Sequence, residues 1–171
     1  MVGFSPCGNF STVQIAVPMK LHTLAQEQRL PITRDAAWEF FSTPRNLNEI
    51  TPKDIGFEIL YQPGDKVHEG QIIAYRIGSL PLVRINWVTE IKAIEDGNAF
   101  VDEQRFGPYK FWHHRHTFED IPGGVLIKDL VHYGLGFGPF GEIAHAVFVR
   151  RKLESIFSHR RQILAARFGD L

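Results

Sequence analysis

A series of short apolar strands followed by one long amphipathic helical pattern is the feature of this sequence that most limits its fold. Strand-like segments follow one another between residues 57 and 133, separated by turn signals such as Asp96-Gly97 and Gly107-Pro108. Turns this short join antiparallel neighbours, because parallel strands need long crossovers. The pattern therefore predicts an antiparallel meander. Its expected strands are 57–61, 71–77, 83–94, 99–106, 111–118 and 125–133.

The period of the pattern changes from Phe140 onward. Apolar residues then recur mostly at three- and four-residue spacing as far as Phe168, which predicts a long helix with one apolar stripe. The opposite face carries charged and polar residues, and we interpret it as a solvated face. A docking surface for an acidic partner or a membrane surface is the alternative interpretation of that face. Its residues are Arg150, Arg151, Lys152, Glu154, Arg161 and Gln162.

The segment before the meander predicts one strand and two short helices. A loosely alternating strand is expected over 20–30, and Pro31 ends it. Thr33 is a candidate N-cap for a short helix that Pro44 stops, and a second helical turn is expected just before Pro52. A long helix that follows an antiparallel sheet must place its stripe against the concave face of that sheet. Because a curved sheet is wider than one helix can fill, we expect a ligand cavity beside the helix.

Composition indicates one globular domain and excludes several classes of protein. The chain has 171 residues, and its 14 Phe supply enough apolar surface for a core without disulfides. Lys and Arg together number 19, and Asp and Glu together also number 19, so no net charge favours nucleic acid as a partner. The sequence lacks an apolar run of the roughly 20 residues that a membrane-spanning helix needs.

The single cysteine and the first residues set further expectations. Cys7 alone can form neither an internal disulfide nor a Cys-rich zinc site, and it is consistent with a reducing cytoplasm. Residues 1–18 lack the basic start of a secretory signal, and we interpret them as an N-terminal extension. Regular patterning begins at Met19, so either Met1 or Met19 is a candidate start. The expected single domain covers residues 19–171.

The strand over 111–118 carries the most informative side chains. Alternation places Trp112, His114 and His116 on one face together with Phe118, and the two large aromatics predict that this face points inward. Asp129 and Tyr133 share a face on the following strand. On the preceding strand a shared face carries two more polar side chains. These are Asp102 and Gln104.

Four interpretations of this polar set remain open. The first interpretation is a structural network that joins His114 or His116 to Asp129, because a buried imidazole or carboxylate is costly unless it is paired. Polar groups that orient a ligand in a pocket are the second. The His-x-His pair with Asp129 or Asp102 as third ligand is compatible with a metal, although the primary expectation includes neither metal nor cofactor. General acid–base catalysis by His114 or His116 is the fourth.

The segment from Gly136 to Gly141 matches the string G-x-G-x-x-G between a strand and a helix. A dinucleotide-binding fold needs a parallel strand after that helix, whereas the pattern here stays helical through residue 168. We therefore reject nucleotide binding. The segment is expected to form a flexible entrance beside the pocket, where Phe137 and Phe140 would contact a ligand.

The chain over residues 20–168 resembles the START/polyketide-cyclase (SRPBCC) superfamily, in particular its uncharacterised bacterial ligand-binding branch. The resemblance rests on the order of elements and on five sequence segments. These are residues 100–104, 107–109, 112–118, 129–133 and the terminal segment 156–160. It implies an α+β helix-grip fold, in which a curved antiparallel sheet wraps around a long C-terminal helix, with two short helices after the first strand. It also implies a deep and mostly apolar cavity.

The resemblance suggests which residues line that cavity, without assigning them a catalytic role. Members of the superfamily bind lipids, sterols, polyketides and plant hormones, and some catalyse cyclisation or dehydration. The first functional hypothesis is therefore binding or carrying of a small hydrophobic molecule. The alternative is a cyclase or dehydratase in which His114 or His116 acts with Asp129. The residues that carry over as candidates are Asp102, Gln104, Trp112, His114, His116, Asp129 and Tyr133.

Overall fold

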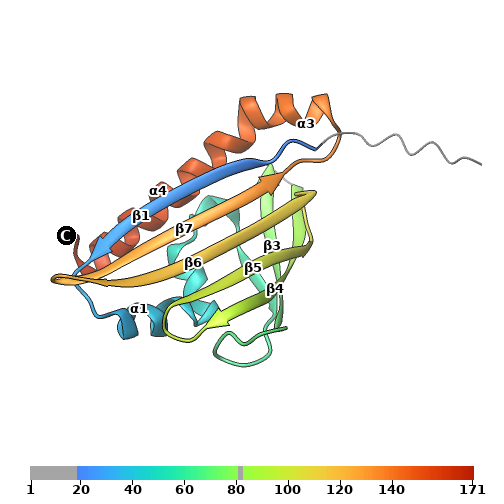
Figure 1. Cartoon of the computed structure of the whole chain (residues 1–171). Helices are drawn as coiled ribbons and strands as arrows, with labels where there is room; N and C mark the ends of the chain where they lie inside the picture. The colour runs from blue at the N-terminus through green and yellow to red at the C-terminus, as the bar shows by residue number, and fades with distance from the viewer. Residues whose placement is uncertain (1–18, 81–82) are drawn as a thin grey trace, which may run out of the picture.

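One antiparallel sheet dominates the computed structural model, which describes residues 19–80 and 83–171 (Figure 1). Its strand order is β1-β7-β6-β5-β4-β3-β2, so the first strand pairs with the last, and strands β2 to β7 form the predicted meander. The strands are β1 (His22–Leu30), β2 (Glu58–Tyr61), β3 (Ile72–Leu80), β4 (Val83–Glu95), β5 (Ala99–Phe106), β6 (Phe111–Ile121) and β7 (Gly124–Gly134). Each expected strand is present, with ends that differ by a few residues.

Short helices connect β1 to β2, as the sequence predicts. The Thr33 hydroxyl oxygen accepts a hydrogen bond from the Ala36 N–H at 3.2 Å and caps the first of them. Pro44 begins the next turn, where its missing N–H costs no helical hydrogen bond. The elements are α1 (Arg34–Phe41), η1 (Pro44–Asn46), α2 (Leu47–Ile50) and η2 (Lys53–Ile55).

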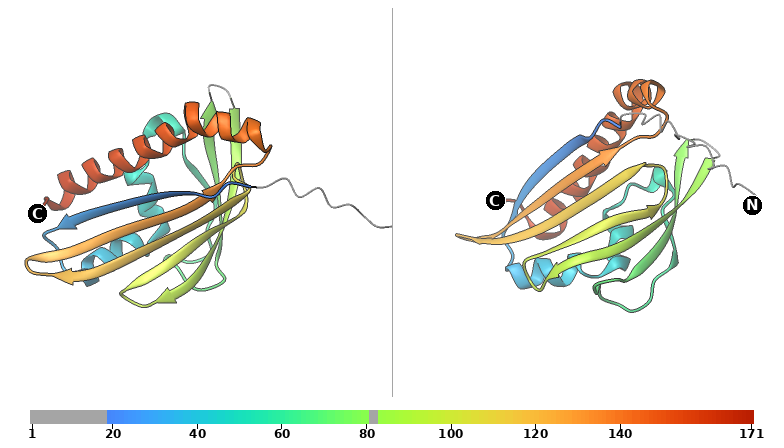
Figure 2. Two further views of the ribbon diagram at one scale, coloured as in Figure 1. Left: turned by 45° about the horizontal axis from the view of Figure 1, so that its top comes forward. Right: turned by 45° about the vertical axis from the view of Figure 1, so that its right-hand side comes forward.

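The C-terminal helix lies along the concave side of the sheet (Figures 1 and 2). The predicted long helix is confirmed, since the chain is helical from Pro139 to Phe168. It consists of α3 (Pro139–Ala144), a π-helical turn η3 (His145–Val149) and α4 (Arg150–Phe168). The apolar stripe of α4 is buried at Leu153, Phe157 and Leu164. Within residues 19–80 and 83–171, no helix is long and apolar enough to cross a membrane.

The curvature of the sheet has a local cause in β4. Ala93 has a φ of 45°, and the register between β4 and β5 shifts between Lys92 and Glu95. Such a bulge adds a residue to one strand, bends it and increases its twist. The sheet consequently curves away from a flat layer, and the long helix covers only part of its concave side (Figure 2).

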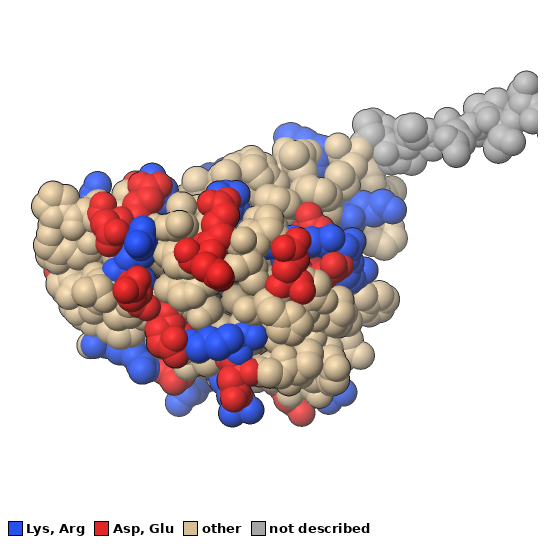
Figure 3. Space-filling view, turned by 60° about the horizontal axis from the view of Figure 1, so that its bottom comes forward, with Lys and Arg blue, Asp and Glu red and all other residues tan. Residues whose placement is uncertain are grey.

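The surface carries mixed charge. Figure 3 shows a face on which acidic and basic side chains lie side by side rather than in separate patches. Exposed pairs of this kind join strands of the sheet. Arg115 of β6 pairs with Glu95 of β4, across β5, at 2.8 Å, and Lys128 of β7 pairs with Glu119 of the neighbouring β6 at 2.7 Å. On the long helix, Arg150 pairs with Glu154 at 2.9 Å. This arrangement is typical of a solvated surface.

Candidate functional site

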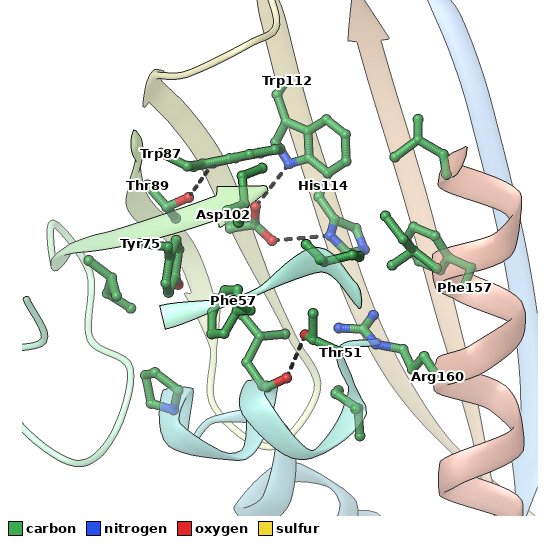
Figure 4. Close-up of a pocket in the computed structure, with 18 of the residues that line it drawn as sticks. Thr51, Phe57, Tyr75, Trp87, Thr89, Asp102, Trp112, His114, Phe157 and Arg160 are labelled. Atoms are coloured by element: carbon green, nitrogen blue, oxygen red, sulfur yellow. Dashed lines mark hydrogen bonds and ion pairs between the residues drawn. The ribbon is translucent and has the colours of Figure 1, made fainter. Parts of the chain in front are cut away.

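A cavity of about 340 Å³ lies between the sheet, the connecting helices and α4 (Figure 4). Its wall is mostly apolar and rich in aromatic rings, since the Trp87 ring meets the Trp112 ring edge-on at 5.0 Å between centroids. A volume of this size is at the lower end of the range of small-molecule sites. Apolar side chains that line it include Phe41, Leu47, Phe57, Ile73, Tyr75, Trp87, Ile91, Phe100, Trp112, Leu153, Ile156 and Phe157.

Polar side chains meet at one wall of the cavity because of strand register. His114 lies opposite Asp102 on β5, and His116 lies opposite Asp129 on β7. Both imidazoles are on the inward face of β6 that the alternation predicts, and both are buried. Three of the four side chains line the cavity, whereas Asp129 is not among its lining residues in the part of the chain that the structure describes.

The two imidazoles and two carboxylates form one compact cluster. The Nε2 atom of His114 lies 2.8 Å from Asp129 Oδ1, and its Nδ1 atom lies 3.2 Å from Asp102 Oδ2. The His116 Nε2 atom lies 3.0 Å from Asp102 Oδ2. Its Nδ1 atom is 2.9 Å from Asp129 Oδ1, close enough for an ion pair although the ring is poorly aligned for a hydrogen bond. The predicted bond between a histidine and Asp129 is therefore present.

Arg160 completes this cluster from the helix side. Its Nη1 atom lies 3.3 Å from Asp129 Oδ1, and its guanidinium lies over the rings of Phe41 and Phe157 at 5.7 and 5.4 Å. The side chain is only 12% exposed and lines the cavity (Figure 4). Arg160 thus joins α4 to β7 by an ion pair that is shielded from water.

The cluster holds its acidic groups ionised. Burial disfavours the charged form of Asp102, but the charge and hydrogen bonds of His114 and His116 outweigh burial and keep the pKa of this carboxyl well below its usual range. Burial also opposes ionisation of Asp129, but the Arg160 charge and the hydrogen bonds of both imidazoles outweigh burial and hold the pKa of this carboxyl well below its usual range.

The same contacts keep His114 protonated. Burial lowers the pKa of its imidazole, yet the charge of Asp102 and the hydrogen bonds to Asp102 and Asp129 raise that pKa from 6.5 to about 9. At neutral pH His114 is therefore an imidazolium whose two N–H groups face two carboxylates. A protonated imidazole and an ionised carboxylate consequently stand side by side on the cavity wall.

Two of the predicted candidates make structural hydrogen bonds and do not themselves line the described cavity. The Gln104 side-chain amide donates to the Tyr109 carbonyl at 2.6 Å and accepts from the Tyr109 N–H at 3.2 Å, so it braces the turn between β5 and β6. Tyr133 is buried, and its hydroxyl lies 2.9 Å from His145 Nε2 in η3. Neither side chain is among the described residues that line the cavity.

The two phenylalanines of the glycine-rich segment do not line the described cavity, contrary to the prediction. Phe137 and Phe140 are 90% and 79% exposed, and within the described part of the chain neither lines the cavity. Leu135, just before this segment, and Phe148 in η3 do line it. The reason is that Phe137 has a φ of 68° and Gly138 a φ of 52°, so the chain reverses there and turns Phe137 outward before α3 begins.

Sequence reasoning missed Arg160, Trp87, Tyr75 and Thr89 as cavity residues. Arg160 had a usable signal, because it follows Phe157 at helical spacing and so continues the apolar stripe, where a charge needs a partner. The Trp87 indole N–H donates a hydrogen bond to the Thr89 hydroxyl at 3.1 Å, so this polar group has a partner at the cavity wall. Trp87 and Thr89 had a signal as well, because alternation over 83–91 places them on one strand face with Ile91 and puts the charged residues on the other face.

Comparisons with known proteins identify the fold. No family model matches the sequence, and no curated protein matches it. Solved structures do match, and several superpose with TM-scores above 0.6. Major latex-like protein 151 from Panax ginseng superposes with a TM-score of 0.64 at 15% identity, covering 86% of this chain and 97% of that one.

Two further structures extend the comparison. A protein from Thermus thermophilus has a TM-score of 0.63 at 13% identity, covering 85% of this chain and 99% of its own. Norcoclaurine synthase from Thalictrum flavum has a TM-score of 0.62 at 13% identity, covering 88% of this chain and 98% of its own. The chain therefore has an α+β helix-grip fold of the START/SRPBCC type. At these identities the likeness concerns the fold alone.

Proposed function

We propose that this protein binds and carries a small hydrophobic molecule in the cavity between the sheet and α4. The observation that supports the proposal most strongly is the aromatic lining around one buried charged wall, since ligand sites combine apolar surface with a few placed polar groups. Among the structural neighbours, the norcoclaurine synthase was solved in complex with a transition-state analogue. We infer that the cavity of this chain also holds an organic molecule.

The chemistry of the wall suggests what the ligand looks like. Trp87, Trp112 and Tyr109 form a group of rings with centroids 4.9–5.4 Å apart, which suits a flat, aromatic or polyketide-like body or a lipid chain. Asp102 is 18% exposed and lines the cavity, so its carboxylate would accept a hydrogen bond from the ligand. We therefore expect an apolar molecule that carries at least one hydroxyl or amine.

A fluorescence titration tests the proposal. The probe 1-anilinonaphthalene-8-sulfonate should bind one site per chain, quench the cavity tryptophans and be displaced by hydrophobic ligands from a lipid and polyketide panel. Ile156 lines the cavity, so Ile156→Trp should fill it and weaken probe binding at least tenfold. Ile143→Trp is the matched control, because Ile143 is 61% exposed on α3. Equal probe affinity in folded Ile156→Trp and the wild type would reject the cavity as the binding site.

A second candidate function, a cyclase or dehydratase, is favoured by the protonated His114 beside the ionised Asp102. An acid and a base within 3.2 Å of each other on one cavity wall are the groups that a dehydration needs. In the original hypothesis Asp129 is the partner, but it lies behind the imidazoles and would act by orienting them. Mass spectrometry of polyketide substrates incubated with the protein should show loss of one water. Unchanged substrates across the panel leave only the carrier function.

We also propose that the carrier works in the cytoplasm. The support is the sequence itself, in which one cysteine leaves no possibility of an internal disulfide. Cell fractionation tests this directly: the protein should be recovered with the cytoplasmic fraction, and recovery from an extracytoplasmic fraction would contradict the assignment.

A further inference from the structure

Three metal-ligating side chains converge on one point of the cavity wall. Asp102, His114 and His116 each offer one ligand atom, and these atoms lie within 4.8 Å of one another. The three residues come from adjacent strands, β5 and β6, so the rigid sheet fixes their spacing rather than a loop. The set contains two imidazoles and one carboxylate, a combination that suits divalent zinc or iron.

The distances within this set resemble those of a preformed metal site. The Asp102 Oδ2 atom lies 3.2 Å from His114 Nδ1 and 3.0 Å from His116 Nε2. Ligand atoms about 2.0–2.1 Å from a tetrahedral zinc ion stand about 3.3 Å apart. Small side-chain movements would therefore place the three atoms around one ion, which replaces the protons that now join them.

The surrounding residues orient each ligand as an outer shell does in metal proteins. Both remaining imidazole nitrogens face one carboxylate, because His114 Nε2 and His116 Nδ1 lie 2.8 and 2.9 Å from Asp129 Oδ1. The Trp112 indole N–H donates to Asp102 Oδ1 at 3.0 Å and leaves Oδ2 to face the imidazoles (Figure 4). A histidine ligand whose second nitrogen is held by a carboxylate is the recurrent arrangement of metal centres.

We propose that Asp102, His114 and His116 form a binding site for a divalent transition-metal ion, with a coordination position open to the cavity. All three ligands line the cavity, whereas Asp129 lies behind them, so the open side faces the space that a ligand would fill. The ion would bind an oxygen atom of the cavity ligand. That last step rests on the proposed carrier function, but binding of the metal itself does not.

A second cluster in the described residues fits a metal less well. His22, Glu142 and His145 also lie close together near the start of the long helix. However, the rings of His22 and His145 are stacked at 3.5 Å, and His145 Nε2 is already engaged with the Tyr133 hydroxyl at 2.9 Å. This cluster therefore serves as the internal alternative in the test.

Metal titration of the tag-free full chain tests the site without any organic ligand. After chelator treatment, Zn²⁺ should bind with a stoichiometry of one, and Co²⁺ should give visible d–d absorption bands of a low-coordinate site. His116→Gln should weaken Zn²⁺ binding at least 100-fold, and Asp129→Asn should weaken it about 10- to 100-fold through loss of the outer shell. His113→Gln is the matched control, because this residue of the same strand does not belong to the cluster.

X-ray absorption of the Zn²⁺-loaded wild-type protein identifies the metal ligands directly, so the result does not depend on whether any variant folds. The spectrum should show two imidazole ligands together with oxygen ligands. Lack of stoichiometric binding, a spectrum without imidazole, or binding lost in His145→Gln but kept in folded His116→Gln would each overturn the proposal. Because none of these measurements includes an organic molecule, failure of the carrier function would leave them unaffected, and the reverse also holds.

Discussion

At the scale of single residues, the molecule depends on buried charges that satisfy one another. The Asp129 carboxylate pairs with His114, His116 and Arg160. This one side chain of β7 therefore links β7 to β6 and to α4. Burial of each charge alone would be costly, and the cluster is tolerated because every charge has an opposite partner. The same balance makes the cluster sensitive to removal of any one member.

Stability should fall with rising pH because of His114. Its folded-state pKa is about 9, above the ordinary 6.5, so its contribution is complete below pH 6.5 and is lost as pH rises through about 9. Urea denaturation of chelator-treated protein should show a loss on the order of 3 kcal/mol over this interval. His114→Gln should flatten the dependence, whereas His113→Gln should keep it. A wild-type profile with no slope between these pH values would contradict the assigned protonation.

Removal of the guanidinium at Arg160 should leave Asp129 as a buried charge with one partner fewer. We expect Arg160→Met to lower the free energy of unfolding by about 3–5 kcal/mol, although the new side chain fits the aromatic surroundings. Arg161→Met at the exposed neighbouring position should change it by about 0.5 kcal/mol or less. Equal effects in the two variants, measured by chemical denaturation, would refute the structural role of Arg160.

At the scale of secondary-structure elements, pairing of the first strand with the last completes the sheet. Leu30 pairs with Val125 at the end of β1, and both side chains are fully buried. Gly124 permits this approach, because a Cβ atom there would lie 2.0 Å from the Leu30 carbonyl oxygen. The β1 backbone therefore passes close to β7 at a residue without a side chain.

Gly124→Ala should consequently separate this end of the two strands. We expect a loss of at least about 2 kcal/mol in unfolding free energy, because the clash involves backbone rather than a flexible side chain. Gly136→Ala is the control, since a Cβ at Gly136 meets no described atom within 4 Å. Thermal denaturation that gives the same midpoint for both variants would show that the close contact is unimportant.

The sequence predicts the elements better than their connections. Alternation in 111–118 correctly places Trp112, His114 and His116 inward, because period two is a property of the strand alone. The π-helical turn η3 within the long helix is not predictable in this way, since the apolar spacing continues across it. The outward position of Phe137 likewise depends on backbone angles that a non-glycine residue rarely adopts.

At the scale of the whole molecule, the cavity is a consequence of shape. In the described residues, a bent seven-stranded sheet surrounds a helix that contacts only part of it. The space between them is lined by aromatic rings and, on one wall, by charged side chains. The order of elements predicts such a space, but not which side chains face it. That depends on how α4 packs against the sheet, which brings Arg160 to the cavity wall.

A crystal structure of the protein purified without added ligand tests the carrier function most directly. We predict electron density for an apolar molecule in the cavity, in contact with Trp112 and Phe157 and with a polar atom near Asp102. Soaking with 1-anilinonaphthalene-8-sulfonate should displace it from the same place. A cavity closed by direct packing of α4 onto the sheet, or one that contains only water even after the soak, would contradict the account.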